Sequence, residues 1–202
     1  MRIITSWDDG RKQDMRLAKL LLKYKIPAIF FISGDTELDK DQIRELAKSF
    51  RIGGHTKTHP QDMKALDDDE LKYVIQRNKE DLERIIQRDI TDFAYPKGRY
   101  DERVIEAVKE AGFKTARTIV IGYTVAKLGP YRLPTTAHVY PHKKEYGDEG
   151  WAKYAWRLMA EGGDFMHIWG HSWEIDKFGM WEELETFFAF VRERVDIKEL
   201  SI

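Results

Sequence analysis

The chain has 202 residues, with 34 Lys or Arg and 35 Asp or Glu, and a formal net charge of −1. This length suits one domain with a sizeable buried core. The balanced charge argues against nucleic acid or an anionic membrane as a partner. Because the chain has no cysteine, disulfides, thiolate metal sites and a cysteine nucleophile are excluded. A metal site would have to use His, Asp or Glu.

The expected location is cytoplasmic. The sequence passes from Met1 and Arg2 straight into a predicted strand, without an apolar leader. No apolar run approaches the roughly 20 residues that a membrane span requires. The sequence gives no indication of oligomeric state.

Short apolar strands alternate with amphipathic helices along the chain. The pattern predicts a strand at 3–7, a helix at 12–25, a strand at 28–32, a helix at 39–50 and a strand at 52–54. A long helix at 66–88, a strand at 92–95 and a helix at 102–111 follow, and then extended segments at 114–121 and 131–139. The chain closes with a helix at 151–161, a strand at 165–170 and a helix at 178–195.

This alternation predicts an α/β fold of about seven parallel βα units in one domain, residues 1–202. That number of units favours a closed or nearly closed barrel, and an open doubly wound sheet is the alternative. In either fold, functional groups belong at the carboxyl ends of the strands. Candidate groups follow four predicted strands there: Asp8 and Asp9, His55, the segment 96–98, and His171.

The first strand ends in two adjacent carboxylates, Asp8 and Asp9, followed by Gly10. Neighbouring side chains on a regular strand point to opposite faces, but Gly10 allows a turn that brings both carboxylates together. One carboxylate could then bind a cation while the other takes a proton from water. The alternative is a strand-to-helix turn, in which Asp is common as a cap.

Two histidines, His55 and His59, follow the third strand at positions i and i+4. On a helical turn these side chains lie on the same side, which suits two ligands of one divalent ion. Together with Asp9 they would form a His, His, Asp set with open positions for water and substrate. A hydrogen-bonded structural role is the alternative for each histidine.

These motifs resemble those of the polysaccharide deacetylase family, the NodB-like carbohydrate esterases of family four. The first motif corresponds to Ser6-Trp7-Asp8-Asp9-Gly10, and the second to His55-Thr56-Lys57-Thr58-His59-Pro60. The third is represented by Pro96 and Gly98, but Ala94 stands where the family has arginine. The segment 165–171, which ends in His171, loosely matches the last motif. The resemblance covers nearly the whole chain.

The resemblance implies a distorted (β/α) barrel that removes N-acetyl groups from an N-acetylated sugar and releases acetate. Asp9, His55 and His59 would hold one divalent metal ion, and Asp8 would be the general base. The backbone N–H near Lys97 would stabilise the oxyanion, and His171 would protonate the departing amine. Zinc is the expected ion, although Co, Ni or Fe also suits these ligands.

Other residues of the last predicted strand and the loop before it have competing roles. His167 shares a face with His171 but lies deeper, and we expect it to be a buried, hydrogen-bonded residue. Trp169 could face the sugar, although core packing is the usual role of a tryptophan on a strand. Glu174 could orient His171 or face solvent. Both His138 and His142 are expected at the surface.

The missing arginine of the third motif leaves Asp8 without an evident cationic partner. Lys97, Arg99 and Arg132 are the candidates. We expect Arg132 to take this role, because it lies in an extended apolar segment where an unpaired charge would be costly. A guanidinium can also grip a carboxylate with two hydrogen bonds. A pair with some structural acid is the alternative for Arg132.

The partner expected from the resemblance is a carbohydrate or another small-molecule amide. An intracellular glycan precursor, a soluble oligosaccharide or a nucleotide sugar suits a protein without an export signal. Hydrolysis of a non-sugar linear or cyclic amide is one alternative function. A catalytically silent carbohydrate-binding relative is another, but the presence of Asp8, Asp9, His55 and His59 argues against it.

Overall fold

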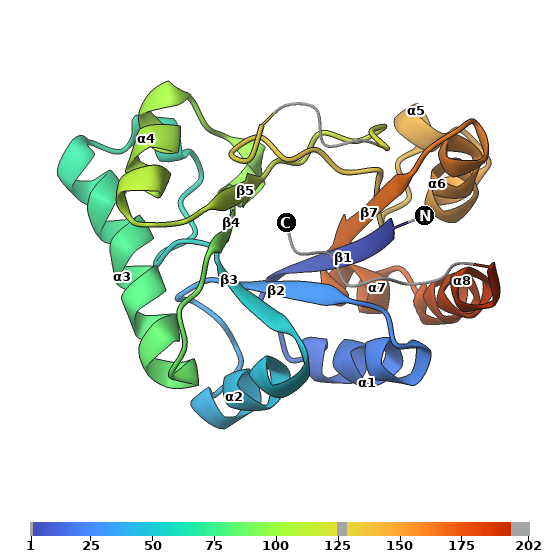
Figure 1. Cartoon of the computed structure of the whole chain (residues 1–202), viewed down its shortest axis with the longest axis horizontal. Helices are drawn as coiled ribbons and strands as arrows, with labels where there is room; N and C mark the ends of the chain where they lie inside the picture. The colour runs from blue at the N-terminus through green and yellow to red at the C-terminus, as the bar shows by residue number, and fades with distance from the viewer. Residues whose placement is uncertain (1, 125–128, 195–202) are drawn as a thin grey trace.

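The computed structural model describes residues 2–124 and 129–194, which form one parallel, seven-stranded sheet in the order β5-β4-β3-β2-β1-β7-β6. Its strands are β1 (Arg2–Asp9), β2 (Ala28–Ile32), β3 (Arg51–Gly54), β4 (Asp92–Ala94), β5 (Thr115–Arg117), β6 (Ala137–His138) and β7 (Phe165–Gly170). The sheet is strongly curved (Figure 1). This architecture confirms the predicted distorted (β/α) barrel of about seven strands.

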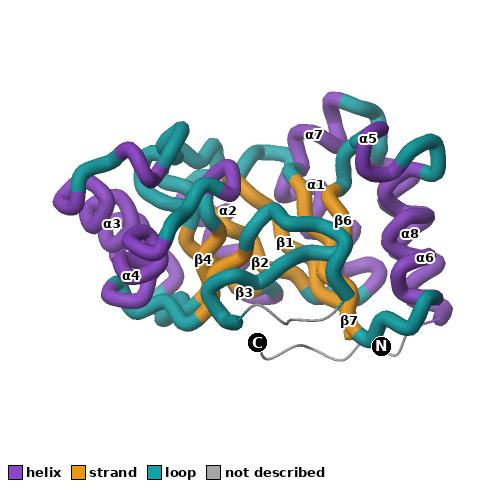
Figure 2. The backbone as a smooth tube through the Cα atoms, turned by 90° about the horizontal axis from the view of Figure 1, so that it is seen from above, coloured by secondary structure: helices purple, strands orange, loops and turns teal. Residues whose placement is uncertain are grey.

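The helices cover the outer, convex face of the sheet. They are α1 (Asp14–Tyr24), α2 (Lys40–Ser49), α3 (Asp68–Ile86), α4 (Glu102–Glu110), α5 (Lys143–Tyr146), α6 (Gly150–Ala160), α7 (Ser172–Lys177) and α8 (Trp181–Arg194), with 3-10 turns η1 (Met63–Ala65) and η2 (Pro96–Gly98). Neighbours pack in series, with α3 against α4 and α2, α1 against α2 and α8, and α6 against α8. Figure 2 shows the sheet between α3 and α4 at one end and α6 and α8 at the other.

Alternation along the strands separates two apolar layers. In β1, Ile3 and Trp7 belong to the main core between sheet and helices, which contains most of the buried apolar side chains. Ile4 belongs instead to a small inner cluster with Ile29, Phe31, Ala94 and Phe165. The inner face of the curved sheet therefore has little apolar filling, and polar side chains occupy the remainder near the strand ends.

Local sequence signals explain where several helices begin. Asp39 caps α2 in a capping box with Gln42, and the side chains of Asp67 and Asp101 accept hydrogen bonds from the first turns of α3 and α4. Within the described residues, no helix is both long and apolar enough to cross a bilayer.

The structure differs from the predicted elements mainly between β5 and α8. Of the extended segment 114–121 only β5 is a strand, and of 131–139 only β6. The intervening described residues pair with each other and with β7 through backbone hydrogen bonds, such as Thr135 N to the Val120 carbonyl and Thr136 N to the His167 carbonyl. The short helix α7, which precedes α8, was not predicted.

Candidate active site

The end of β1 carries both aspartates into one site, as their sequence position predicts. Asp8 lies on the inner face of the sheet, whereas Asp9 has a φ of 81° and leaves the regular strand geometry. Gly10, with a φ of 75°, continues this turn, and a Cβ there would lie 2.4 Å from the Thr36 hydroxyl. A left-handed backbone at two successive residues therefore brings the neighbouring carboxylates to a common site.

Two histidine side chains face one oxygen of Asp9. Oδ1 of Asp9 lies 3.7 Å from Nε2 of His55 and 3.4 Å from Nε2 of His59, and the three potential ligand atoms all lie within 4.8 Å of one another. This buried Oδ1 has no hydrogen-bond partner among the described residues. A buried carboxylate oxygen without a donor, facing two imidazole nitrogens, is what a divalent-ion site requires. These residues fit the predicted metal ion.

The surroundings of the two histidines hold Nε2 ready to bind a cation. Nδ1–H of His55 donates to the Ala94 carbonyl at 2.8 Å, which fixes the tautomer with Nε2 unprotonated. Burial lowers the pKa of His55, so the neutral form that a metal requires is favoured. The backbone of His59 is held by the Thr56 hydroxyl, which accepts from His59 N–H at 3.1 Å.

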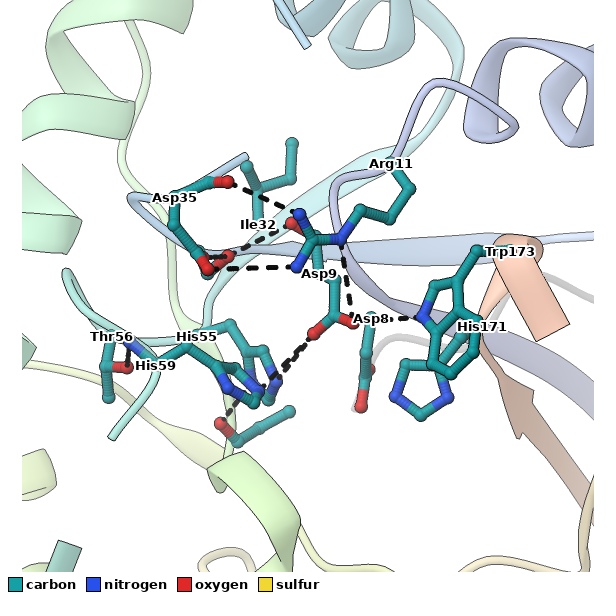
Figure 3. A network of polar contacts seen from close by, with 12 residues as sticks. Asp8, Asp9, Arg11, Ile32, Asp35, His55, Thr56, His59, His171 and Trp173 are labelled. Atoms are coloured by element: carbon teal, nitrogen blue, oxygen red, sulfur yellow. Dashed lines mark hydrogen bonds and ion pairs between the residues drawn. The ribbon is translucent and has the colours of Figure 1, made fainter. Parts of the chain in front are cut away.

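The other oxygen of Asp9 is held from the opposite side of the site. Nε1–H of Trp173 donates to Oδ2 at 3.2 Å, and Nε of Arg11 lies 3.9 Å from the same oxygen. Figure 3 shows His55 and His59 on one side of Asp9 and Trp173 with His171 on the other. The carboxylate is therefore fixed in orientation, with Oδ1 directed to the histidines.

Asp8 is paired with Arg117, not with the predicted Arg132. Nη2 of Arg117 donates to Oδ2 of Asp8, and the guanidinium carbon lies 4.6 Å from the ring centroid of Trp169. Arg117 is only 1% exposed. Burial alone would raise the pKa of Asp8, but the charges of Arg117, His55 and His171 and the hydrogen bond from Arg117 hold it below its ordinary value.

The prediction for Arg132 was wrong because its side chain lies at the surface. Nη2 of Arg132 pairs there with Glu102, and the Arg132 side chain is 38% exposed. Arg132 therefore has the structural acid that was the alternative. Arg99 likewise pairs with an acid near the surface, Asp62, at 3.4 Å.

His171 follows β7 and faces the site beside Trp173, as expected for a group at a strand end. Its Nδ1–H donates to Oε2 of Glu174 at 2.6 Å. Burial alone would lower the pKa of His171, but the hydrogen bond to Glu174 and the charges of Asp8 and Glu174 raise it above its ordinary value. Glu174 is buried and orients His171, so it is not a solvent-facing residue.

A second imidazole also holds Glu174. Nε2–H of His138 donates to Oε2 of Glu174 at 3.0 Å, and Nδ1 of His138 lies 2.8 Å from Nε2 of His142. His138 is buried, and this burial lowers its pKa to about 4. The prediction that His138 is a surface residue was wrong, because His138 lies on β6, which pairs with β7. The ligand atoms of His138, His171 and Glu174 also lie within 4.8 Å of one another.

The structure separates the roles of the remaining residues of β7. His167 is buried, and its Nε2 hydrogen-bonds the Ser6 hydroxyl at 2.9 Å, as predicted. Burial lowers the pKa of His167 to about 3. Of its two expected roles, Trp169 has core packing and not the sugar-facing one, since it is 6% exposed and stacks on His138 with ring centroids 3.9 Å apart.

Lys97 lies in η2 with a φ of 55°, and its side chain is exposed and bonded to Gln61. The Lys97 side chain is therefore paired with Gln61 and not with Asp8. The role of the nearby backbone N–H in binding an oxyanion stays a prediction.

Arg117 and His138 are the residues that sequence reasoning missed. Arg117 lies inside the predicted extended segment 114–121, and a charge within a mostly uncharged extended segment was the available signal; in the structure it ends β5. The sequence separation of 109 positions between Asp8 and Arg117 conceals the pairing, which depends on the curvature of the sheet. His138 gave no comparable signal, because its segment has little regular secondary structure.

Comparison with known proteins finds relatives within one family. The polysaccharide deacetylase family model matches residues 2–116. The Bacillus subtilis protein YxkH, whose name is that of a polysaccharide deacetylase, is 25% identical over 138 residues, which are 65% of this chain and 49% of YxkH. The chain thus corresponds to about half the length of this relative.

Solved structures share the fold at low sequence identity. A family 4 carbohydrate esterase from Streptomyces lividans, in complex with acetate, superposes with a TM-score of 0.67 at 14% identity and covers 95% of this chain and 89% of its own. A family 4 pseudoenzyme from Bacillus anthracis also has a TM-score of 0.67, at 16% identity. The match covers 96% of this chain and 61% of the pseudoenzyme. The family match extends over more than half of the chain and includes both aspartates and both site histidines. The chain belongs to the polysaccharide deacetylase family, the NodB-like carbohydrate esterases of family four.

Proposed function

We propose that the protein is a metal-dependent hydrolase that removes N-acetyl groups from an N-acetylated sugar or oligosaccharide and releases acetate. One observation carries the proposal. The unpartnered Oδ1 of Asp9 faces His55 and His59, while Asp8 and His171 flank the same site with separate ion-pair partners. The catalytic domain would comprise residues 1–202, and the cytoplasmic location stays a prediction.

Asp9, His55 and His59 would hold a divalent ion, with zinc as the expected metal and Co, Ni or Fe as alternatives. When bound, such an ion polarises the acyl carbonyl as a Lewis acid and lowers the pKa of a water molecule. Trp173 and Arg11 contribute by holding Asp9 in place from the side away from the histidines.

Asp8 is suited to accept the proton of the attacking water. Oδ2 is bound by Arg117, but the buried Oδ1 has no hydrogen-bond partner within the described chain and can receive a proton. The lowered pKa keeps Asp8 ionised at neutral pH, which is the form that a general base needs. Water then adds to the amide carbon, and the N–H near Lys97 would stabilise the oxyanion.

His171 is suited to complete the reaction as the acid. Its Nδ1–H is committed to Glu174, so Nε2 is the nitrogen that can give a proton to the departing amine. The raised pKa of His171 favours the protonated form that this step requires. The C–N bond breaks as the amine takes that proton, leaving acetate and a free amino sugar.

The test is acetate release from N-acetylated chitooligosaccharides by protein loaded with zinc, compared with the same protein after chelation. The proposal predicts release that chelation abolishes and added metal restores. Release unaffected by chelation would contradict metal dependence. If loaded protein releases no acetate from sugars but hydrolyses linear or cyclic amides, the alternative hydrolase function holds. Saccharide binding without hydrolysis would indicate a silent relative like the Bacillus anthracis pseudoenzyme.

A further inference from the structure

A cleft of about 470 Å³ lies beside the candidate site, between α2 and α3. Figure 1 shows these two helices next to each other on the outer face of the sheet. The cleft is lined by five cationic side chains and one carboxylate, Asp81; the cations are Lys40, Arg44, Lys57, Arg77 and Arg84. A concave surface with such an excess of positive charge attracts anions.

The single carboxylate does not neutralise these cations. Lys57, Arg77 and Arg84 approach Asp81 at 2.9, 3.3 and 3.0 Å, and Arg77 also pairs with Glu80 at 3.5 Å, so three positive charges share two negative charges. Partial burial would raise the pKa of Asp81, but the hydrogen bond from Lys57 and the charges of Lys57 and Arg77 hold it below its ordinary value. Asp81 therefore stays ionised and fixes these cations in the cleft.

The opposite wall presents cationic donors that are free to bind a ligand. Arg44 is held by Asp41 through Nη1 at 2.6 Å and by the Ile85 carbonyl through Nε at 3.1 Å. Its Nη2 makes no hydrogen bond or ion pair within the described chain, and neither does the ammonium of Lys40. A fixed guanidinium with a free N–H is well suited to an oxyanion.

The cleft adjoins the site through the loops that carry the site residues. Ser33 and Lys57 both line the cleft; the Ser33 hydroxyl donates to the Asp9 carbonyl at 3.0 Å, and Lys57 lies between His55 and His59 in sequence. Gly34 keeps these loops close, because a Cβ there would lie 2.3 Å from the Lys57 carbonyl oxygen. The cleft is larger than a single oxyanion requires, and Ile43, Leu82 and Ile85 add apolar lining for a larger molecule.

From this arrangement we propose that the cleft between α2 and α3 is an anion subsite, which binds a phosphate, sulfate or carboxylate group of an acidic N-acetylated saccharide or the same anion free in solution. The saccharide form rests on the proposed function. It would make acidic saccharides better substrates than neutral ones.

The binding test titrates the protein with inorganic phosphate by calorimetry at low and at high salt. Arg44→Gln/Arg77→Gln removes one cation from each wall, and Arg157→Gln/Arg194→Gln removes two arginines of comparable exposure on α6 and α8. The cleft variant should bind phosphate at least about tenfold more weakly, because the loss of one hydrogen bond to a charged group raises Kd by about that factor or more. The control variant should bind like wild type, and high salt should weaken wild-type binding.

Other outcomes of this titration overturn the proposal. No binding to wild type at low salt, or equal binding to wild type and the cleft variant, would do so. Binding lost only in His55→Ala/His59→Ala would assign the phosphate to the metal-binding residues. If the double variant does not fold, Lys40→Gln replaces it; Lys40 is exposed and has no ion-pair partner among the described residues, and its loss should still weaken binding several-fold.

Kinetics with loaded enzyme identify the source of the anion. If the anion is part of the substrate, Arg44→Gln/Arg77→Gln raises KM for a phosphorylated N-acetyl saccharide and leaves turnover of neutral chitooligosaccharide unchanged. If it is free in solution, phosphate changes turnover of the neutral substrate in wild type and not in the variant. Acetate release from neutral substrate tests the proposed deacetylase function separately. Failure of the anion subsite proposal therefore does not imply failure of the proposed function, and the reverse also holds.

Discussion

Asp8 and Asp9 have the same side chain and adjacent positions, but their surroundings give them different chemistry. Asp8 faces a buried guanidinium, whereas Asp9 presents an unpartnered oxygen to two imidazoles. The sequence alone did not order these roles, and the family resemblance assigned them. The structure supplies the physical reason, because a carboxylate that is already bound to arginine is the less available metal ligand.

Asp8→Asn should therefore remove the base without removing the metal. We expect kcat to fall by a factor of about 10²–10⁴, which is typical of a lost general base. Metal content, measured by atomic absorption on the same preparation, should match wild type. Loss of the metal would show that the roles of the two aspartates are exchanged.

Arg117→Met should destabilise the protein by about 3–5 kcal/mol, because it leaves Asp8 buried without its partner. The pKa of Asp8 should then rise, so the acidic limb of the kcat profile should move to higher pH. Arg132→Met, which breaks an exposed pair with Glu102, is the matched control and should cost at most about 1 kcal/mol.

Denaturant unfolding and pH–rate profiles measure both effects. If Arg117→Met is too unstable for kinetics, Arg117→Lys keeps the charge and should retain part of the activity. An unshifted acidic limb in a folded Arg117→Met variant would contradict the support of Asp8 by Arg117.

Glu174→Gln should weaken His171 as an acid. The hydrogen bond and charge of Glu174 raise the pKa of His171, whereas burial lowers it, so the substitution should lower this pKa. A general acid acts below its pKa, and the alkaline limb of the kcat profile should thus move to lower pH. Glu145→Gln, beside the more distant His142, should leave that limb in place. A shift of equal size in both variants would indicate a general electrostatic effect.

At the scale of elements, the regular part of the chain was well predicted from sequence. The first four strands and the helices between them were found because apolar periodicity and Asp caps agree there. The segment from β5 to β7 was not, because its hydrogen bonds depend on tertiary partners. The missed residues Arg117 and His138 both belong to this segment or border it, so the candidate site was predicted only where a regular strand end supplied it.

The start of α1 contains a buried carboxyl group that gives a prediction about stability. Asp14 is fully buried, and this burial raises its pKa to about 7 from an ordinary value of 3.8. The folded state thus binds a proton that the unfolded state releases between about pH 4 and 7. Folding stability contributed by this group is therefore present at low pH and lost as pH rises through about 7.

Asp14→Asn should abolish this decline. The affected free energy of unfolding is at most about 4 kcal/mol, since each pKa unit corresponds to about 1.36 kcal/mol. The measurement is urea unfolding between pH 4 and 8. Asp41→Asn, exposed in the first turn of α2, should keep the wild-type dependence. Identical pH dependence in wild type and Asp14→Asn would contradict this account of Asp14.

At the scale of the whole molecule, the curvature of the sheet assembles the site. Asp8 on β1 and Arg117 on the edge strand β5 are separated by β2, β3 and β4 in the sheet, yet their side chains form an ion pair across its inner face. The approximate number of strands and their parallel orientation could be predicted from the βα alternation. The partner that curvature brings to Asp8 could not, because a one-dimensional pattern does not specify which side chains meet across a sheet.

The most direct test of the central claim is a zinc titration of metal-free protein with acetate release from N-acetylated chitooligosaccharide as the readout. The account predicts that activity rises linearly and saturates at about one zinc per chain, as three protein ligands with an open position imply. His55→Ala/His59→Ala should neither retain zinc nor release acetate. Full activity without metal, saturation only after a second zinc has bound, as at His138, His171 and Glu174, or undiminished activity in the double variant would contradict the account.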